Sequence, residues 1–450
     1  MSVHSQMFDL ILSGGTIVNA EGERRADVAI SAGKVAAILS PGETAQAHEV
    51  LRVDGCHLIP GLVDAHVHLR EPGLTHKEDF DSGTRAAALG GVTTVLDMPT
   101  DEPWTASAVQ LADKIAMAQG RVHVDVGFQA VLGQDIGGLE ELLALRPVSL
   151  ELFTADVPAA FRFDTMDAVS RMLRRLSHVQ TLIGISPGDQ SILQGETLRE
   201  DAGDIEAFLT SRPPLAEANG IARAVLAAAS SSSRIHVRQI NSALGVGTWR
   251  RMRDMADITV ETTPQNFFFA ATDYETFGAN LKGSPPLREQ HDVEALRGAL
   301  AEGLIDIICT DHAPHSQAEK AMRYGAFSDI PGGMPGLQTL LPTMLKLVGE
   351  GLIELKDLVR MCSRTPAVRF GLSRSKGAIA LGFDADVVVL DRRLNSQLTN
   401  AEQVSRAGYT PFDGWSIPAT LRHIFLRGTE IVRDGYTIAQ AGGKVVASEI

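Results

Sequence analysis

The chain has 450 residues, of which 41 are Lys or Arg and 55 are Asp or Glu, so its formal net charge is −14. This acidic balance, without a basic run, disfavours nucleic acid and anionic membrane surfaces as partners. No apolar run reaches the length of about 18 residues that predicts a membrane span, and the first residues lack the pattern of a signal peptide. Cys56, Cys309 and Cys362 are odd in number and far apart, so we expect no disulfide framework and a cytoplasmic protein.

Short strands separated by turns are predicted over residues 7–58, in stretches such as "FDLILSGGTIVNAEG" and "HEVLRVDGCHLIPG". The chain then alternates apolar strands with helix-like segments: "SGTRAAALGG" leads into "VTTVLDMP", and "DVEALRGALAEGL" into "IDIICTD". This alternation runs over about 315 residues and predicts a parallel α/β fold. About eight units are present, which favours a TIM barrel over an open sheet. Towards the end, "ADVVVLD", "LRHIFLRGTEIVRDGY" and "GGKVVAS" return to strands and turns.

Polar side chains follow two of the predicted barrel strands. In "GLVDAHVHLREPG", His66, His68 and Arg70 are spaced two apart, so a strand would present all three on one face. An H-x-H pair is either a metal site or two hydrogen-bonded, partly buried imidazoles. The strand in "IDIICTDHAPHS" ends at Asp311, and barrel active sites lie at the carboxyl ends of strands. Zinc takes such nitrogen and oxygen ligands and, in catalysis, keeps a position open for water.

Several longer segments resemble one family in the order that the family has them. "DAHVHLREPGLTHKEDFDSGTRAAALGGVTTVLDMPT", "KGSPPLR", "GLIDIICTDHAPHS" and "PGGMPGLQTLLP" are similar to the cyclic-amide branch of the amidohydrolase superfamily, which includes dihydroorotases, allantoinases and hydantoinases. The motifs are most similar to those of dihydroorotases, and "KGAIALGFDADVVVLD" and "YTPFDGWSI" resemble the family's C-terminal segment. The resemblance implies a (β/α)₈ barrel over residues 58–375. It also implies a small β-sandwich built from residues 1–57 and 376–450 of the two chain ends.

The resemblance also implies a set of metal ligands, from which this chain departs. Where the family has a carboxylated lysine on the fourth strand, "SLELF" places Glu151, whose two oxygens can stand in for the carbamate. Where the family has histidines on the fifth and sixth strands, this chain has Ile185, or Ser186, and Gln239. His236 lies three residues before Gln239, on the opposite face of a strand, and is interpreted as a structural residue.

Mapped onto this chain, one of the family's two metal sites is complete. Its ligands are His66, His68, Glu151 and Asp311, whereas the other site has lost both histidines. We therefore expect one metal per chain, Zn²⁺, which can lower the pKa of bound water to about 7 and supply hydroxide to the amide carbon. Asp311 is the expected catalytic residue, accepting a proton from that water and passing it to the leaving nitrogen.

The family resemblance implies a substrate pocket as well. Arg70 is expected to hold a substrate carboxylate through two parallel hydrogen bonds, or else to form a salt bridge at the barrel mouth, and His315 is expected to be a second anion contact. Two asparagines of the dihydroorotase pocket are replaced by Thr100 and Ser284. The substrate is thus predicted to be a small cyclic amide bearing a carboxylate, whose exact identity the altered pocket leaves open.

Three hypotheses for the function stay open at this point. The first is a dihydroorotase-like hydrolase that opens the C–N bond of a cyclic amide or ureide, in pyrimidine or ureide metabolism. The second is a hydrolase of another amide, imide or lactone, like an allantoinase or hydantoinase, because a fold does not fix a substrate. The third is a barrel that has lost catalysis and serves as a partner subunit. The family resemblance also implies a homo-oligomer.

Overall fold

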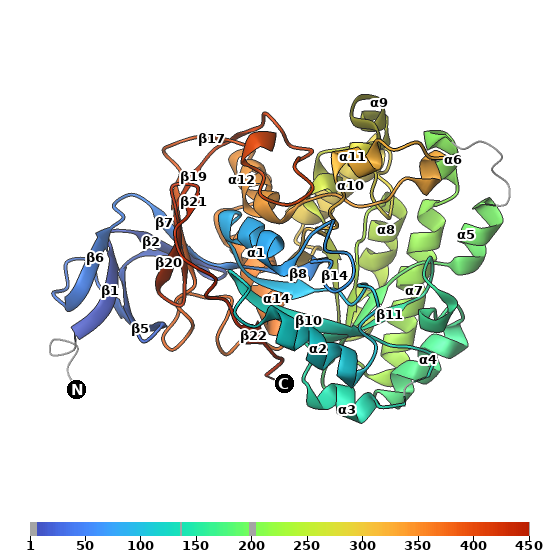
Figure 1. The fold of residues 1–450 in the computed structure, drawn as a ribbon, viewed down its shortest axis with the longest axis horizontal. Helices are drawn as coiled ribbons and strands as arrows, with labels where there is room; N and C mark the ends of the chain where they lie inside the picture. The colour runs from blue at the N-terminus through green and yellow to red at the C-terminus, as the bar shows by residue number, and fades with distance from the viewer. Residues whose placement is uncertain (1–6, 136, 198–203, 450) are drawn as a thin grey trace.

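The computed structural model describes residues 7–135, 137–197 and 204–449 and shows a barrel flanked by β-sheets (Figure 1). The barrel expected from the sequence is confirmed. Eight parallel strands of the described chain follow one another in sequence order, and a parallel bridge between Val67 and His312 joins the last to the first. The strands are β8 (Leu62–Val67), β9 (Val92–Asp97), β10 (Asp125–Val131), β11 (Ser149–Phe153), β12 (Leu182–Ser186), β13 (Ile235–Val237), β14 (Ile258–Thr262) and β15 (Ile307–Ile308).

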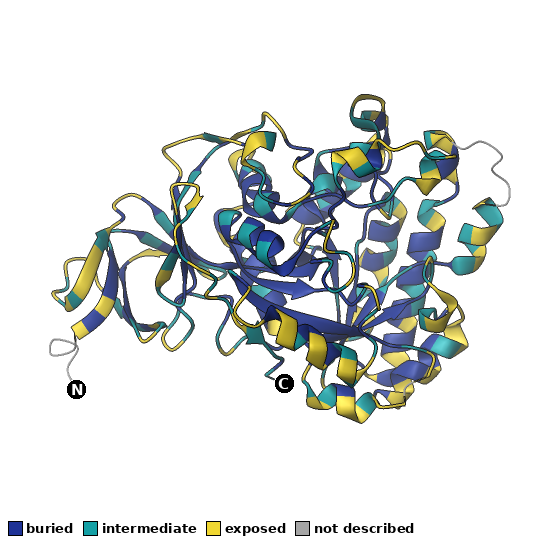
Figure 2. Cartoon of the chain, in the orientation of Figure 1, coloured by how far each residue is buried: buried dark blue, intermediate teal, exposed yellow. Residues whose placement is uncertain are grey.

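The barrel strands are buried on both faces, as a parallel sheet covered by helices requires. All six residues of β8 are buried, and Figure 2 shows the strands dark against helices whose outer faces are exposed. The helices are α1 (Phe80–Leu89), α2 (Ala108–Ala118), α3 (Leu139–Ala144), α4 (Met166–Arg175), α5 (Gln190–Thr197), α6 (Ile205–Thr210), α7 (Pro214–Ser231), α8 (Ala243–Met252), α9 (Tyr274–Phe277), α10 (Gln290–Ala301), α11 (Gln317–Lys320), α12 (Leu340–Gly349), α13 (Leu355–Val359) and α14 (Thr365–Arg369).

Local sequence signals fix where the barrel helices begin. Asp79 precedes α1, and its carboxylate accepts the backbone N–H of Ser82 at 2.8 Å, satisfying a donor that the helix leaves free. Pro214 is the first residue of α7, where its missing N–H costs no intrahelical hydrogen bond. The loops that precede α1 and α7 therefore end at defined residues.

Strands from both chain ends share the seven-stranded sheet beside the barrel, so the dark red strands lie beside the blue ones in Figure 1. β7 pairs with β16 and with β2, which joins the first residues to the last third of the chain. The boundaries at residues 57 and 375 stay predictions. The four-stranded sheet contains β1 (Met7–Ser13), β4 (Asp27–Ser31), β5 (Lys34–Leu39) and β6 (Gln46–Arg52). The seven-stranded sheet contains β2 (Thr16–Asn19), β3 (Gly22–Arg25), β7 (His57–Pro60), β16 (Val387–Asp391), β19 (Thr420–Leu426), β20 (Thr429–Arg433) and β21 (Tyr436–Thr437). A two-stranded sheet contains β17 (Ser396–Gln397) and β18 (Ser416–Ile417).

The C-terminal tail returns to the barrel. Its strand β22 (Val445–Val446) pairs in parallel with the first part of β10, at Val126 and Gly127. The pairing of β10 with β11 begins further along β10, at Gln129. The tail therefore lies at the amino-terminal end of the strands, which we call the barrel base. There Val446 packs against a buried cluster that includes Phe370.

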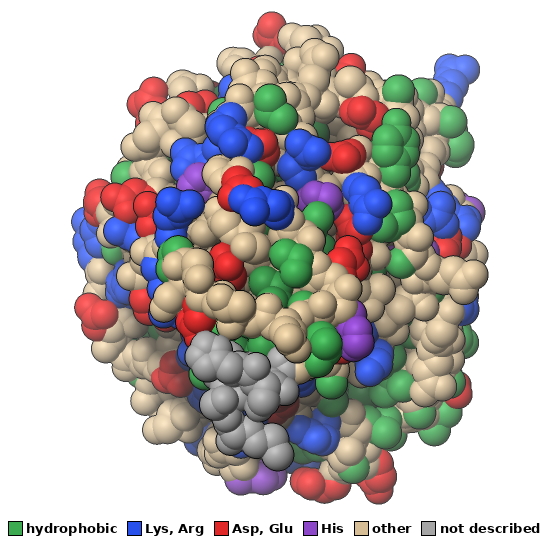
Figure 3. Space-filling view, turned by 90° about the vertical axis from the view of Figure 1, so that its left-hand side faces the viewer, with side chains coloured by type: hydrophobic (Ala, Val, Ile, Leu, Met, Phe, Trp, Pro, Cys, Tyr) green, Lys and Arg blue, Asp and Glu red, His purple; other side chains and the backbone are tan. Residues whose placement is uncertain are grey.

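The surface carries charges of both signs. On the face turned towards the viewer in Figure 3, Lys and Arg side chains are intermixed with Asp and Glu side chains. Within the described ranges, no helix has both the length and the apolar character needed to cross a membrane.

Candidate active site

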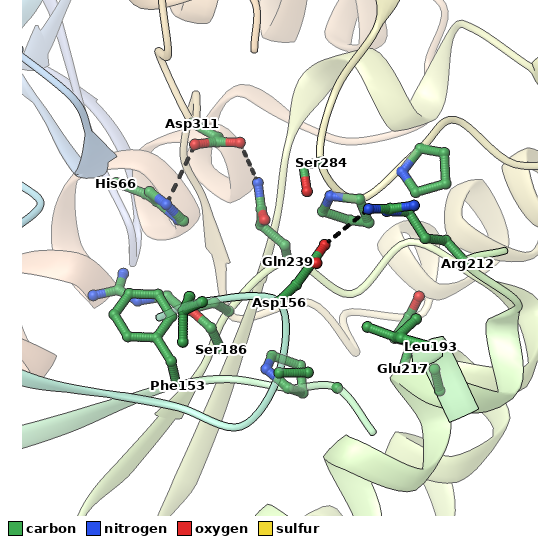
Figure 4. Close-up of a pocket in the computed structure, with 18 of the residues that line it drawn as sticks. His66, Phe153, Asp156, Ser186, Leu193, Arg212, Glu217, Gln239, Ser284 and Asp311 are labelled. Carbon is green, nitrogen blue, oxygen red and sulfur yellow. Dashed lines mark hydrogen bonds and ion pairs between the residues drawn. The ribbon is translucent and has the colours of Figure 1, made fainter. Parts of the chain in front are cut away.

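Three of the predicted site residues meet at the carboxyl end of the barrel. His66 lies on β8, His68 follows it by two residues, and Asp311 comes just after β15. Asp311 Oδ1 lies 3.3 Å from His66 Nε2 and 3.2 Å from His68 Nε2 (Figure 4). Ligands about 2.0–2.2 Å from a tetrahedral zinc ion are about 3.3–3.6 Å from one another. The separations of these three atoms therefore fit one bound metal ion.

The other ring nitrogens of both histidines are held by neighbours. His66 Nδ1 is hydrogen-bonded to Glu261 Oε1 at 2.5 Å, and His68 Nδ1 to Thr100 Oγ1 at 2.8 Å. Such contacts fix an imidazole so that its Nε2 faces a metal. The structure places Thr100, whose contact with substrate stays a prediction, against His68. Glu261 was not predicted, although it is an acidic residue in a mostly buried strand.

The electrostatics favour the protonation states that metal ligation needs at Asp311 and His68, but not at His66. Burial would raise the pKa of Asp311, but His66 and His68 together hold it below its ordinary value. Burial and the charge of Arg70 lower the pKa of His68 to about 4. Burial lowers the pKa of His66, yet Glu261 and Asp311 raise it above its ordinary value, so metal binding there releases a proton.

Glu151 faces a different partner. It is fully buried on β11, and among the described residues it belongs to neither of the two groups of possible metal ligands that include His66. Its Oε1 accepts hydrogen bonds from Arg238 Nη2 at 2.7 Å and from Ser149 Oγ at 2.6 Å. Its Oε2 accepts from Arg238 Nε at 3.2 Å. The structure thus compensates the charge of Glu151, which the family resemblance predicts to be a metal ligand, with the guanidinium of Arg238.

Arg238 is the residue that sequence reasoning missed. It is completely buried inside the barrel, where Nη1 donates to Glu261 Oε2 and to the carbonyl of Ala65, both at 3.0 Å. Nη2 also donates to the side-chain oxygen of Gln129. Burial would lower the pKa of Arg238, but Glu151 and Glu261 raise it well above its ordinary value. An arginine directly after the buried strand β13, in "IHVRQI", was the available signal.

The residues at the family's other histidine positions offer no imidazole. Gln239 donates from its amide to Asp311 Oδ2, which leaves Oδ1 facing the histidines. Ile185 is fully buried, and Ser186 lines the pocket. His236 is buried and hydrogen-bonded to Glu261 Oε2 at 2.8 Å, below the three-residue group.

A pocket of about 230 Å³ opens beside His66, His68 and Asp311. Ser284, from the predicted substrate set, lies on its wall together with Gln239. Apolar side chains form much of the rest. They include Phe153, Val157, Leu193, Pro213, Ala216, Pro285 and Pro286.

Arg70 and His315 form a pair outside that pocket lining. Arg70 has a positive φ of 63°, and its Nη2 lies 3.4 Å from His315 Nε2. Its Nε is buried and has no hydrogen-bond partner among the described residues. Burial and Arg70 lower the pKa of His315 to about 3, so its ring is neutral. In this pair, the Nε–H group of Arg70 remains as a hydrogen-bond donor for an anion.

The barrel, with two histidines and an aspartate converging at its carboxyl end, defines a metal-dependent barrel hydrolase. Residues 55–243 match the dihydro-orotase-like family, and residues 247–431 match the amidohydrolase family. The chain is 32% identical over 445 residues to a dihydroorotase from Methanothermobacter thermautotrophicus, with 98% of each chain covered. It is 30% identical to an allantoinase from Deinococcus radiodurans, with 97% of this chain and 98% of that one covered.

Solved structures give the same result. An L-hydantoinase from Arthrobacter aurescens is 27% identical and superposes with a TM-score of 0.93, covering 98% of this chain and 100% of that one. A D-hydantoinase from a Bacillus species is 30% identical with a TM-score of 0.90, covering 98% and 99%. The chain therefore belongs to the amidohydrolase family, in its cyclic-amide branch, and is a cyclic amide hydrolase. The family predicted from the sequence motifs is confirmed.

Proposed function

We propose that this protein hydrolyses a ring C–N bond of a cyclic amide or ureide in the manner of a dihydroorotase, with one Zn²⁺ per chain. The observation that carries the proposal is the convergence of His66 Nε2, His68 Nε2 and Asp311 Oδ1 at the pocket wall, with separations of 3.2 and 3.3 Å. A zinc ion bound there would lower the pKa of the attacking water and polarise the amide carbonyl.

The residues of the chain manage the proton in this scheme. Asp311 accepts a proton from the attacking water and delivers it to the leaving nitrogen, acting first as a base and then as an acid. Gln239 holds Asp311 Oδ2 and so fixes the orientation of the carboxylate. Arg238 already neutralises Glu151, which supports a site with three protein ligands and disfavours a second metal.

The finer proposal concerns the substrate. The Arg70 and His315 pair supports recognition of a carboxylate on the ring, because the guanidinium keeps an unpartnered Nε–H among the described groups. Ser284 contacts the ring in the pocket, and Thr100 acts through His68. We also propose a cytoplasmic homo-oligomer. The three free, buried cysteines support the cytoplasmic location, and family resemblance alone supports the oligomer.

A second candidate is an allantoinase-like or hydantoinase-like hydrolase that accepts rings with a bulky substituent. The pocket wall of Phe153, Val157 and Leu193 favours it, since these side chains would contact an apolar group rather than a carboxylate.

Metal content and a substrate panel test these proposals together. Elemental analysis of protein purified without added metal should give one zinc per chain. Ring opening should then be measured with dihydroorotate, allantoin and unsubstituted hydantoin, and dihydroorotate should be the best of these three. A metal ratio near two contradicts the mononuclear site. Absence of ring opening by the zinc-loaded protein would instead favour a barrel that has lost catalysis.

A further inference from the structure

A second arginine faces the pocket on the wall opposite the histidines. Arg212 lies in the loop before α7, and Figure 4 shows its guanidinium extending into the pocket across from Asp311. Its Nη2 donates to Asp156 Oδ2 at 3.2 Å, and its Nη1 donates to Ser211 Oγ at 3.0 Å. Its Nε is buried and lacks a hydrogen-bond partner within the described ranges. A buried donor without an acceptor is costly, so this guanidinium has unused binding capacity.

The guanidinium is held in place by its surroundings. The ring of Phe208 lies under it, with the guanidinium carbon 5.1 Å from the ring centroid. Arg288 donates to the backbone carbonyl of Arg212, and its own Nε donates to Asn241 Oδ1 at 3.0 Å. The main chain at Arg212 is thus fixed, and the planar group costs little to order when a ligand binds.

Asp156, the acidic partner of Arg212, can be replaced by a carboxylate of a ligand. The Asp156 side chain is 48% exposed, whereas that of Arg212 is 23% exposed. An ion pair with such an exposed member contributes little to stability. The other acid on this wall, Glu217, has partners of its own: Arg288 Nη2 lies 3.6 Å from its Oε2, and the backbone N–H groups of Asn241 and Ser242 donate to its Oε1. A ligand carboxylate can therefore take the place of Asp156.

We propose that Arg212 determines substrate specificity by binding an acidic group at the end of a short arm on the ring. This inference rests on the proposed ring opening at His66, His68 and Asp311. The substrate class is a cyclic ureide whose arm carries a carboxylate across the pocket, away from the metal ligands. Two parallel N–H to oxygen hydrogen bonds, from Nε and one Nη of Arg212, would hold that carboxylate.

Two hydantoins that differ only in the end of the arm test the proposal. One carries a carboxyethyl group and the other a carbamoylethyl group, which has nearly the same shape without the charge. Wild-type protein should show a kcat/KM at least tenfold higher for the acid. Arg212→Met should remove this preference through a higher KM for the acid, and should leave the amide within about threefold. Asp156→Asn should keep or increase the preference, because it removes the competing carboxylate.

The controls separate this role from a structural one. Arg171→Met, on α4 with a side chain 69% exposed, should leave both substrates unchanged. Arg212→Lys should keep part of the preference, since it keeps the charge but not the planar fork. Equal loss for both substrates in Arg212→Met would show that Arg212 only braces the loop, and an acid preference that survives in this variant would overturn the proposal.

The proposed function and this inference fail in different ways. If the zinc-loaded wild type opens both rings equally well, ring opening stands and the role of Arg212 is refuted. If it opens neither ring, the proposed function is refuted, and calorimetric binding of the acid and the amide still tests Arg212. Tighter binding of the acid that Arg212→Met abolishes would support the anion site, and equal binding would refute it.

Discussion

Arg238 carries a permanent positive charge in the barrel interior, and two carboxylates compensate this charge. Glu151 and Glu261 both accept hydrogen bonds from it, and all three side chains are at most 1% exposed. Breaking a buried ion pair leaves one charge uncompensated, which is far more costly than losing an exposed pair. Glu151 is therefore important for stability at a position where the sequence predicts a metal ligand.

Glu151→Gln separates these two roles. We expect the variant to retain one metal per chain, because Glu151 does not face the three converging ligands. The free energy of unfolding should fall by about 3 kcal/mol, because Arg238 loses a charged partner. Denaturant unfolding and elemental analysis measure the two quantities. In a Glu151→Leu and Arg238→Met double variant, stability should partly recover. Loss of metal at unchanged stability would instead establish Glu151 as a ligand.

The sequence was informative about side chains that follow one another closely and less so about contacts across the barrel. The two-residue spacing of His66 and His68 places both on one face, and the strand end at Asp311 places it at the same rim. Strand alternation does not tell which inward-facing charges meet, however. The pairing of Glu151 with Arg238 depends on the barrel's register, in which Glu151 lies opposite Gly184 on the neighbouring strand.

At the scale of elements, two buried lysines join the loops beside the pocket. Lys320, on α11, donates to the carbonyls of Ala279 at 2.8 Å and Lys282 at 3.2 Å. Lys282 donates to the carbonyls of Phe327 at 2.7 Å and Ser328 at 2.8 Å. Backbone carbonyls bind an ammonium group but do not neutralise it. Burial and the charge of Lys282 accordingly lower the pKa of Lys320 to about 7.

This lowered pKa gives stability a pH dependence of known sign. The unfolded chain holds the Lys320 proton up to about pH 10.5, its ordinary pKa, whereas the folded chain releases it above about pH 7. The contribution of Lys320 to stability is therefore full above pH 10.5 and is lost as the pH falls towards 7. The free energy of unfolding, measured with urea, should rise more steeply between pH 7 and 10 for the wild type than for Lys320→Met. The two slopes should differ by at most about 1.4 kcal/mol per pH unit. Parallel curves would contradict the expectation.

The order and type of the barrel elements followed from the sequence, and the strand character of "GGKVVAS", which contains β22, was predicted as well. The pairing of β22 with the barrel strand β10 was not predicted. It forms because Val126 donates its N–H to Lys444 and Gly443 donates to Val122, at 2.9 and 2.8 Å. Such pairing is decided by tertiary contacts, which a local pattern does not contain.

At the scale of the whole molecule, the tail holds the barrel base far from the pocket. Deleting residues 441–450 should lower the free energy of unfolding by about 3 kcal/mol, because the deletion exposes apolar surface at the base and removes backbone hydrogen bonds. Metal content and KM should stay unchanged. Tyr436→Ala, at a site 74% exposed, is the control and should change stability by less than about 0.5 kcal/mol. A tail deletion that abolished metal binding would show that base and site are coupled.

The pairing of the two chain ends has a consequence for synthesis on the ribosome. β7 cannot complete its sheet until β16 has been made, and their registered partners, such as His57 and Leu390, are separated by most of the chain. β22 reaches the barrel base only after all the barrel strands have been made. β7 therefore leaves the ribosome paired with β2 but with its other edge free, and we expect its sheet to be completed only after β16 has been made, with chaperones covering that edge in the interval.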